Sequence, residues 1–467
     1  MRNILYTICL LLVTGYSKAQ YLDEIFKKLH DPKELRKDVD FVRRKLEKEH
    51  INLYKFITKK ELDYKFDSLK QAINKPMISL QFNARLLSVL STIGDGHLAS
   101  IFDQAKFSTA DMEYLQRPKK QRGIGTLDYR VLNKKLYIKQ NNTGDNSIKV
   151  GDEIVSIENK PADKIIDTMM RSIPSDGYNQ TYKTFTLNQG QFDQFYNFLW
   201  DAKDTTIIEL KQNNTTRLVY LKPPIASNVV MKINNAPNIS YKFLKPDSTI
   251  VFLKVRTFML DSTFKGFDEI FKTIKKAKTK TLVLDLRGNT GGKLGWSSNL
   301  FSYLTTKPGY FFNKPDELIK NYLIPGLNKL RDKQIKWYKQ YNLYSQVLLQ
   351  RDGFWGDLYV LTDGGTFSAA SLLTANLKKY RAVTIVGEET GGSRNIWTAG
   401  EMKTEILPES KMLLVYGILP LTFGDLTDNT GRGTMPDIPI NYTIADIMAK
   451  KDLEMDWVLK DITKKAL

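Results

Sequence analysis

The stretch that determines the fold class of this sequence is Leu358-Tyr-Val-Leu-Thr-Asp-Gly-Gly-Thr-Phe-Ser368-Ala-Ala-Ser-Leu-Leu-Thr374. It reads as a short apolar strand, a glycine turn, and a serine at which an amphipathic helix begins. A serine at this place lies beside unpaired backbone N–H groups and the positive end of the helix dipole, where a developing oxyanion is stabilised. Ser368 is therefore a candidate nucleophile. Serine is also a preferred helix N-cap, so the rest of the chain has to decide between the two interpretations.

Strands and helices alternate in the C-terminal half of the chain. An apolar strand at 250–255 is followed by a helix with apolar residues on one face, and then by a second apolar strand at 281–286. Further strands are predicted at 382–386 and 411–416. This β-α-β order predicts an α/β fold.

A glycine pair follows the second of these strands, in Asp285-Leu-Arg-Gly-Asn-Thr-Gly291-Gly292. Such a pair allows backbone N–H groups to approach a ligand closely. A plain turn and a phosphate loop are the alternatives, but no Gly-Lys-Ser/Thr sequence follows, which disfavours a phosphate loop. We expect Asp285 and Arg287 to brace this turn.

The region from Tyr21 to about Ser91 has the apolar spacing of amphipathic helices. It ends in Ile93-Gly-Asp-Gly-His97, where two glycines break the helix and place His97 on a turn. The chain has only three histidines, and the other two, His30 and His50, lie in charged helical context. His97 is the candidate general base, with a turn histidine bonded to backbone as the alternative.

A β-rich module is predicted from about Gln121 to Pro224, where short strands alternate with turns. The turn Val150-Gly-Asp152, followed by an apolar strand and an Asn-Lys hairpin, resembles a PDZ domain, which binds a peptide C-terminus by strand addition. In that resemblance Gly123, Ile124 and Gly125 form the carboxylate-binding loop. The segment from Ser172 to Trp200 is longer than a PDZ domain needs, so an inserted helix and loop, or a purely structural module, are alternatives.

The first twenty residues have the pattern of a secretory leader. Arg2 precedes a short apolar run from Ile4 to Val13, and Ser17-Lys18-Ala19 predicts cleavage after Ala19. Cys9, the only cysteine, lies in that leader, so we expect no disulfide or thiolate site in the mature protein. No later segment is apolar enough to span a membrane. We therefore expect an exported, periplasmic or extracellular protein.

The formal charge of the chain is +19, which raises the question of a nucleic-acid partner. The lysines are dispersed, without a basic arm or an RNA-binding aromatic pattern, so we expect a solvated basic surface and no nucleic acid.

Four motifs in this order, behind a PDZ-like module, resemble the tail-specific, or C-terminal-processing, serine peptidases. They are Asp285-Leu-Arg-Gly-Asn-Thr-Gly-Gly292, Thr366-Phe-Ser-Ala369, Gly387-Glu-Glu-Thr-Gly-Gly392, and Gly431 with Met435-Pro-Asp437-Ile438. The resemblance extends from about 30 to 445. It implies a spiral β-α catalytic domain like those of Clp protease and crotonase.

The family has two catalytic arrangements. In the processing enzymes a lysine activates the serine, but the corresponding segment here is Thr390-Gly-Gly-Ser393, and Arg394 stays protonated at working pH. The other branch resembles the tricorn core protease and the retinoid-binding repeats of the retina. In that resemblance His97 is the base and Asp428 stands where the tricorn-like enzymes carry a glutamate.

The resemblance implies that Ser368 attacks the scissile carbonyl, that His97 relays the proton, and that Asp428 orients the imidazole. The oxyanion would be bound by N–H groups of Gly291, Gly292 and Ala369. We expect no cofactor and no metal site. The predicted function is that of an exported serine endopeptidase acting on peptides or unfolded protein C-termini. The alternatives are a catalytically inactive binding protein on the same scaffold and, less favoured because Ser368 lacks a Gly-x-Ser-x-Gly elbow, an α/β-hydrolase-type esterase.

We expect the chain to consist of four parts. They are a signal peptide (1–19), an N-terminal helical region carrying the His97 turn (20–115), a PDZ-like module (116–225) and an α/β serine peptidase catalytic domain (226–467).

Overall fold

The structure of the protein is a computed structural model. It describes residues 24–108 and 122–465, apart from 191, 201–202, 213–214, 224–235, 245–247, 262, 314–335, 337–345, 426–427 and 429. The predicted leader with Cys9, and the predicted boundaries at 115/116 and 225/226, lie outside the described residues.

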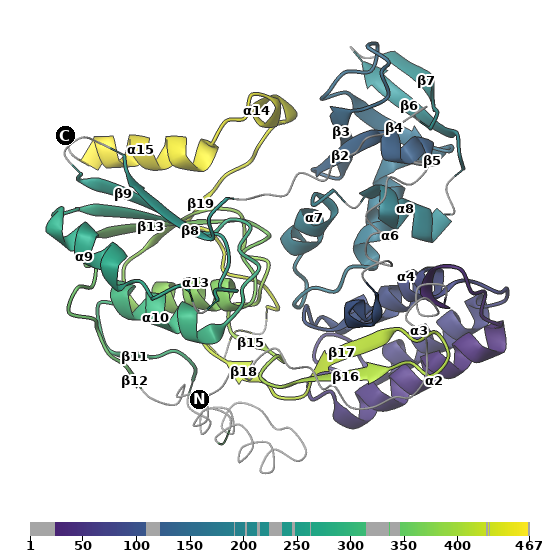
Figure 1. Ribbon diagram of the computed structural model, residues 1–467, viewed down its shortest axis with the longest axis horizontal. Helices are drawn as coiled ribbons and strands as arrows, with labels where there is room; N and C mark the ends of the chain where they lie inside the picture. The colour runs from purple at the N-terminus through teal and green to yellow at the C-terminus, as the bar shows by residue number, and fades with distance from the viewer. Residues whose placement is uncertain are drawn as a thin grey trace.

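A six-stranded sheet forms the centre of the C-terminal part, on the left of Figure 1. Its strand order is β19-β14-β13-β10-β9-β8, and every pair is parallel except β8 with β9. The strands are β8 (Ile239–Phe243), β9 (Ile250–Val255), β10 (Thr281–Asp285), β13 (Asp357–Thr362), β14 (Thr384–Gly387) and β19 (Ile438–Pro439).

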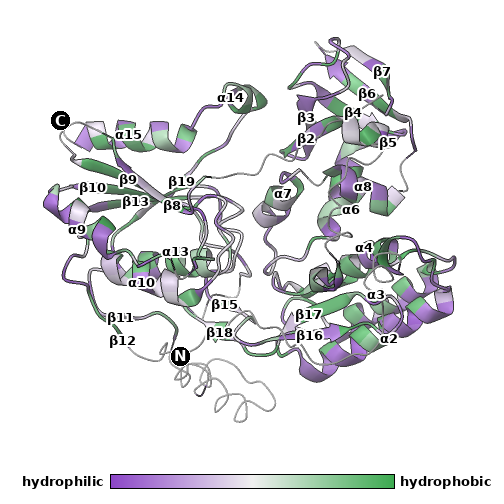
Figure 2. Ribbon diagram, in the orientation of Figure 1, coloured by the Kyte–Doolittle hydropathy of each residue, from purple (hydrophilic) through white to green (hydrophobic). Residues whose placement is uncertain are grey.

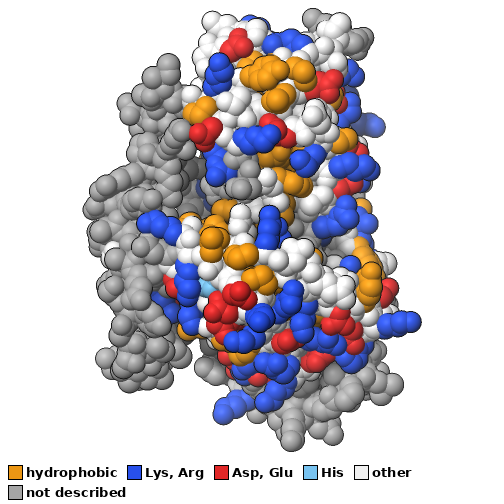
Figure 3. Space-filling view, turned by 90° about the vertical axis from the view of Figure 1, so that its right-hand side faces the viewer, with side chains coloured by type: hydrophobic (Ala, Val, Ile, Leu, Met, Phe, Trp, Pro, Cys, Tyr) orange, Lys and Arg blue, Asp and Glu red, His pale blue; other side chains and the backbone are white. Residues whose placement is uncertain are grey.

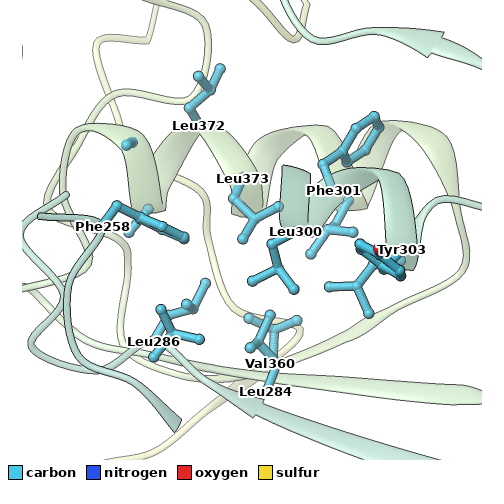
Figure 4. Close-up of a cluster of buried hydrophobic side chains, with 14 of the residues drawn as sticks. Phe258, Leu284, Leu286, Leu300, Phe301, Tyr303, Val360, Leu372 and Leu373 are labelled. Atoms are coloured by element: carbon cyan, nitrogen blue, oxygen red, sulfur yellow. The ribbon is translucent and has the colours of Figure 1, made fainter. Parts of the chain in front are cut away.

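Both faces of this sheet are covered, because its inner strands are apolar on both sides. One face packs on the helices α10 and α13 through a large apolar cluster, part of which Figure 4 shows between the sheet and these helices. The other face packs on α15, where Val458 is fully buried. The helices of this part are α9 (Asp268–Lys276), α10 (Leu294–Leu304), α13 (Ala369–Tyr380), α14 (Ile444–Met448) and α15 (Leu453–Lys465).

Short strands extend the α/β part away from the sheet. They form the two-stranded pairs β11·β12 and β15·β18 and the antiparallel pair β16·β17. These strands are β11 (Gly309–Tyr310), β12 (Gln346–Val347), β15 (Ile396–Trp397), β16 (Met402–Ile406), β17 (Leu413–Gly417) and β18 (Leu421–Thr422).

The N-terminal helices pack against β16 and β17, although more than three hundred residues separate them in sequence (Figure 1). Helix α2 begins with a capping box between Asp31 and Glu34. Its apolar residues at helical spacing are fully buried in one cluster with Leu414 and Tyr416 of β17. The elements here are α2 (Pro32–Glu49), α3 (Lys59–Ala72), α4 (Ser79–Leu90), η1 (Ser91–Ile93), β1 (Ala99–Ile101) and η2 (Gln104–Lys106). Strand β1 pairs with β17, so this part of the α/β chain completes the N-terminal core.

The β-rich module, at the upper right of Figure 1, is an antiparallel sheet of order β2-β3-β4-β6-β7, with β5 paired to β4. Three helices accompany it and bury their apolar faces against it. Its elements are η3 (Gly123–Thr126), β2 (Leu127–Leu132), β3 (Lys135–Asn141), β4 (Glu153–Ile157), β5 (Lys160–Pro161), α6 (Ala162–Arg171), α7 (Thr181–Leu187), α8 (Phe192–Trp200), β6 (Thr206–Gln212) and β7 (Thr215–Leu221). Helix α7 lies between the module and the α/β part (Figure 1).

Apolar and charged side chains are distributed over the molecule as expected for a folded chain with dispersed lysines. Apolar residues line the inner sides of the elements and hydrophilic residues their outer sides (Figure 2). On the face made by the β-rich module and the N-terminal helices, Lys and Arg lie interspersed with Asp and Glu (Figure 3). Within the described residues, no helix combines the length and apolar character needed to cross a membrane.

Candidate active site

Ser368 stands at the N-cap of α13 but does not cap the helix with its side chain. Its backbone has φ 53° and ψ −123°, a strained conformation for a residue with a side chain. The hydroxyl Oγ lies 3.1 Å from Nε2 of His97 instead. The capping interpretation of this serine therefore does not hold, and the strain is of the kind found where a fold holds a reactive group in place.

His97 reaches Ser368 from a turn directly after α4 and η1. Gly94, in the left-handed region at φ +74°, ends the helical segment as predicted. The imidazole packs between the rings of Phe367, at 4.8 Å, and Trp397, at 5.1 Å. These rings fix the plane of the imidazole and leave its Nε2 directed at the serine.

Two buried carboxylates lie behind His97. Oδ1 of Asp95 accepts the backbone N–H of His97 at 2.8 Å and lies 4.0 Å from its ring Nδ1. Asp176 accepts the backbone N–H groups of Gly96 and Ser393, both at 2.8 Å. Among the described residues, Nδ1 of His97 has no hydrogen-bond partner. The acidic side of the site is thus made by Asp95 and Asp176.

The two carboxylates differ in their protonation behaviour. Burial acts to raise the pKa of Asp95, but the hydrogen bond from His50 and the nearby His97 outweigh it and leave the pKa lowered. Burial raises the pKa of Asp176, and the charge of Asp95 adds to this, although His97 acts against it. Asp95 is therefore the carboxylate held in its charged form beside His97.

Asp428, the predicted acidic partner, is bound elsewhere. Its carboxylate accepts hydrogen bonds from the Arg394 guanidinium and, at 2.7 Å, from the Thr430 hydroxyl. Although burial acts to raise it, these partners lower the pKa of Asp428 to about 2. The structure gives no contact between Asp428 and His97, so the expected His97–Asp428 pair is corrected to an Arg394–Asp428 ion pair. The expectation from the resemblance is wrong because the Arg394 guanidinium binds the Asp428 carboxylate.

The sequence contained a signal for only one of the two buried carboxylates that lie behind His97. Asp95 lies two residues before His97, within the glycine-rich turn that was singled out, and a carboxylate so close in sequence can accept the N–H of the histidine. Asp176 comes from the loop between α6 and α7 of the β-rich module. No sequence motif around Asp176 predicts its place near His97, because that place depends on how the module packs on the other two parts.

The predicted oxyanion turn lies directly against the start of α13. A Cβ on Gly291, which has φ +99°, would lie 2.7 Å from Cβ of Ser368 and 2.9 Å from the N of Ala369. The N–H of Gly291 donates to Oδ1 of Asn289 at 2.9 Å, so this group is already used. Gly292 is paired with Phe258 through a β-bridge. Gly291 thus allows the turn to pack closely on Ser368, but its N–H is not free to bind an oxyanion. The N–H groups of Gly292 and Ala369 remain the candidate oxyanion donors.

The turn before the glycine pair is braced as expected. Arg287 donates to Asp285 at 2.9 Å and to Asp452 at 2.8 Å, and it also bonds Glu454 at 3.0 Å. Burial acts to lower the pKa of Arg287, but its carboxylate partners outweigh this and raise it. This network ties the strand end to α15.

The predicted carboxylate-binding loop is closed. The N–H of Gly123 donates to the Asp204 carbonyl at 2.7 Å, and that of Gly125 to the Arg122 carbonyl at 2.9 Å. Ile124 is completely buried. These three residues form the 3₁₀ turn η3 and present no row of free N–H groups, so the expectation that they bind a substrate carboxylate is corrected.

The sheet edge beside this turn is also occupied. Asn188 accepts the N–H of Val131 in β2 at 2.7 Å and donates to its carbonyl at 3.0 Å, as a neighbouring strand would. The ring of Phe192 in α8 packs on Tyr129 of β2 at 4.6 Å. The long segment after Ser172 therefore contains the helices α7 and α8, and Asn188 and Phe192 from this segment contact β2, the edge strand of the module.

An apolar cavity of about 210 Å³ adjoins the His97 turn. Gly96 and Leu98 line it from the turn, Leu87 from α4, and Tyr182 and Phe195 from the inserted helices. Tyr182 also stacks on Phe367 at 4.5 Å, one residue before the candidate nucleophile.

One group in the described part of the chain has the spacing of metal ligands. Ligand atoms of Asp95, His97 and Asp176 lie within 4.8 Å of one another. Each carboxylate already accepts backbone N–H groups, and Nε2 of His97 contacts Ser368. We therefore interpret Asp95, His97 and Asp176 as part of the candidate serine site and not as a cation site.

Comparison with known proteins places the α/β part in a described family. Residues 249–440 match the model of peptidase family S41. A structure of mature CPAF is similar with a TM-score of 0.55 and 15% sequence identity, covering 89% of this chain and 94% of that chain. A structure of mature CPAF complexed with lactacystin is similar with a TM-score of 0.58 and 15% identity, covering 93% of this chain and 98% of that chain. At this identity the two structures establish a shared fold.

Proposed function

Because residues 249–440 form a peptidase family S41 domain, we propose that this protein is an exported serine endopeptidase in which His97 activates Ser368. The observation that carries the proposal is the 3.1 Å contact between Nε2 of His97 and Oγ of Ser368. The two residues are 271 positions apart and belong to different parts of the fold. A structural serine at this N-cap would bond the first turn of its own helix instead.

The reaction follows the general course of acyl transfer. Oγ of Ser368 attacks the scissile carbonyl carbon while Nε2 of His97 takes the hydroxyl proton. The tetrahedral intermediate collapses as the imidazolium returns that proton to the leaving amine, which departs with the C-terminal part of the substrate. A water molecule then attacks the acyl-serine with the same histidine as base, and it releases the N-terminal part as a carboxylic acid.

The oxyanion of each tetrahedral intermediate is bound by N–H groups of Gly292 and Ala369. Ala369 is the first residue of α13, so its N–H has no partner inside the helix, and the helix dipole adds to its effect. The N–H of Phe258 donates to the Gly291 carbonyl at 2.8 Å and the N–H of Lys293 to the Phe258 carbonyl at 3.0 Å. These bonds hold the turn in position before the charge develops, which is what makes such donors effective.

Asp95 orients His97 and stabilises the imidazolium. Its 4.0 Å separation from Nδ1 is long for a hydrogen bond, but such contacts are commonly loose without substrate. Asp176, the other buried carboxylate, holds the backbone on both sides of the imidazole.

A lysine-activated serine is not compatible with the local sequence. The segment Thr390-Gly-Gly-Ser393 carries no lysine, and Arg394 is paired with Asp428. A guanidinium also keeps its proton at working pH. These observations support histidine as the base.

The substrates we propose are peptides and unstructured protein segments. Since η3 and the edge of β2 are occupied, recognition falls to the apolar cavity beside His97, which suits a bulky apolar side chain near the scissile bond. The leader-like residues 1–19 support export, so the site of action is the periplasm or the extracellular space.

The test is labelling with an organophosphonate serine-hydrolase probe, together with cleavage of a peptide library. Wild type is expected to be labelled and active, and Ser368→Ala and His97→Ala to lose both. Lactacystin, which was bound in one of the similar structures, provides a second active-site probe. Absence of labelling in wild type, or labelling that survives Ser368→Ala, would contradict the mechanism and favour a binding protein on this scaffold.

A further inference from the structure

We propose that His50 is a positioning residue of the active site, which holds the Asp95 carboxylate behind His97. This inference rests on the proposed function. Nε2 of His50 lies 2.9 Å from Oδ2 of Asp95, and the other carboxylate oxygen accepts the N–H of His97. The order His50, Asp95, His97, Ser368 thus forms one chain of contacts that runs from the N-terminal helices to the nucleophile.

The direction of the first hydrogen bond follows from chemistry. An ionised carboxylate only accepts, so Nε2 of His50 carries the proton and donates it. The side chain of His50 is completely buried and that of Asp95 nearly so. In such surroundings a carboxylate depends on its donors, because no water replaces a lost one.

The backbone around His50 is well fixed. His50 is the C-cap residue of α2, and its own N–H bonds the Leu46 carbonyl at 2.9 Å. Two residues later, Asn52 donates to the Thr398 hydroxyl at 3.1 Å, next to the Trp397 ring that packs on His97. The end of α2 therefore supports both the acid and the aromatic wall of the imidazole.

The other charged groups near Asp95 do not take over this role. The two carboxylate oxygens of Asp176 accept the backbone N–H groups of Gly96 and Ser393, so they are not available to Asp95. Lys55, whose pKa is lowered to about 8, chiefly by burial, interacts with Asp176 and Asp428. Among the described residues, His50 is the side chain that donates to Asp95.

The decisive comparison is between His50→Leu and His50→Gln. Leucine fills similar space without a donor, whereas the Nε2 of glutamine lies at the same number of bonds from the backbone as that of histidine. We expect His50→Leu to lower kcat by about 10- to 100-fold with KM nearly unchanged, because a buried charged group loses a hydrogen bond. His50→Gln is expected to recover kcat to within about threefold of wild type, the remaining loss reflecting its more flexible side chain. The rate of phosphonate labelling at Ser368 should follow kcat.

His30 offers a matched control. It is equally buried and its Nε2 contacts a side chain, the Ser79 hydroxyl at 3.0 Å, but it lies in the N-terminal core. His30→Leu is expected to lower the melting temperature without changing kcat. If His50→Leu does not fold, His50→Asn gives the same comparison, since its shorter amide does not reach Asp95.

The outcomes separate the two proposals. If wild type is neither labelled nor active, the proposed function fails. If wild type is active and His50→Leu or His50→Asn keeps its kcat, or if glutamine recovers nothing, the positioning role of His50 is refuted.

Discussion

Gly291→Ala is the substitution that tests the geometry of the site most directly. The glycine has φ +99°, a conformation that residues with a side chain rarely adopt. An added Cβ would lie 2.7 Å from Cβ of Ser368, about 0.7 Å inside the 3.4 Å at which ordinary van der Waals contact begins. The Cβ of Ser368 is fixed by its backbone, and the other two near atoms, N of Ala369 and O of Phe367, are backbone atoms, so rotation of a side chain cannot relieve the contact.

Two effects follow, and their sizes differ. The positive φ costs about 1 to 3 kcal/mol of stability. The displacement of Ser368 by several tenths of an ångström moves Oγ away from Nε2 of His97, and misplacement by about 1 Å costs roughly 100-fold in rate. We therefore expect kcat to fall by about 10- to 100-fold, and KM to change less than kcat, because Gly291 does not line the apolar cavity.

The assay is steady-state hydrolysis of a peptide found in the library screen, combined with thermal melting. Gly295→Ala is the matched control, because Gly295 lies in the first turn of α10 with nothing within 4 Å of the added Cβ. That variant should keep its kcat and gain about 0.5 to 1 kcal/mol of stability. A Gly291→Ala enzyme that folds and retains wild-type kcat would refute the placement of this turn against the nucleophile.

Three further outcomes follow from individual contacts. Asn188→Ala leaves the N–H and carbonyl of Val131 unpaired, and urea unfolding should show a loss of about 2 to 3 kcal/mol; an unchanged unfolding midpoint would mean that the edge of β2 is not closed by this side chain. Asp176→Asn places an amide N–H against a backbone N–H and removes charge near His97, so kcat should fall by about 10- to 100-fold; a kcat equal to that of wild type would exclude a role in the site. The pKa of Asp428 is about 2, below its unfolded value of about 3.9, so its pairing with Arg394 contributes stability above about pH 4 that is lost as pH falls towards 2. The free energies of unfolding of wild type and Asp428→Asn should differ by about 1 kcal/mol or less at pH 7 and converge near pH 2, and a difference that persists there would contradict the assignment.

Much of the α/β fold could be predicted from the sequence. The strands at 250–255 and 281–286, and the strand, turn and helix around Ser368, lie where the apolar pattern placed them, to within one or two residues. The four glycine-containing motifs predicted the tail-specific peptidase family, and residues 249–440 match the model of peptidase family S41. Such features are readable because each depends on neighbours close in sequence.

The sequence was less informative about the β-rich module. Its strands were predicted, but its turn Gly123–Gly125 was interpreted as a ligand loop. The N–H groups of Gly123 and Gly125 are taken up by the carbonyls of Asp204 and Arg122, and Asn188 closes the adjoining edge of β2 from more than fifty residues away. A glycine pattern specifies a backbone shape but not what lies against it.

The sequence by itself predicted Ser368 as the candidate nucleophile, His97 as the candidate base and the glycine turn beside them, because each stands on a local element whose geometry its own residues specify. Only the tertiary structure decided which carboxylates serve them. Asp95 is bound by His50 at the end of α2, Asp176 is brought to Ser393 by the packing of the β-rich module, and Asp428 is bound by Arg394. The physical reason is that a buried charge is stabilised by whichever donors the packing brings to it, and those donors come from distant parts of the chain.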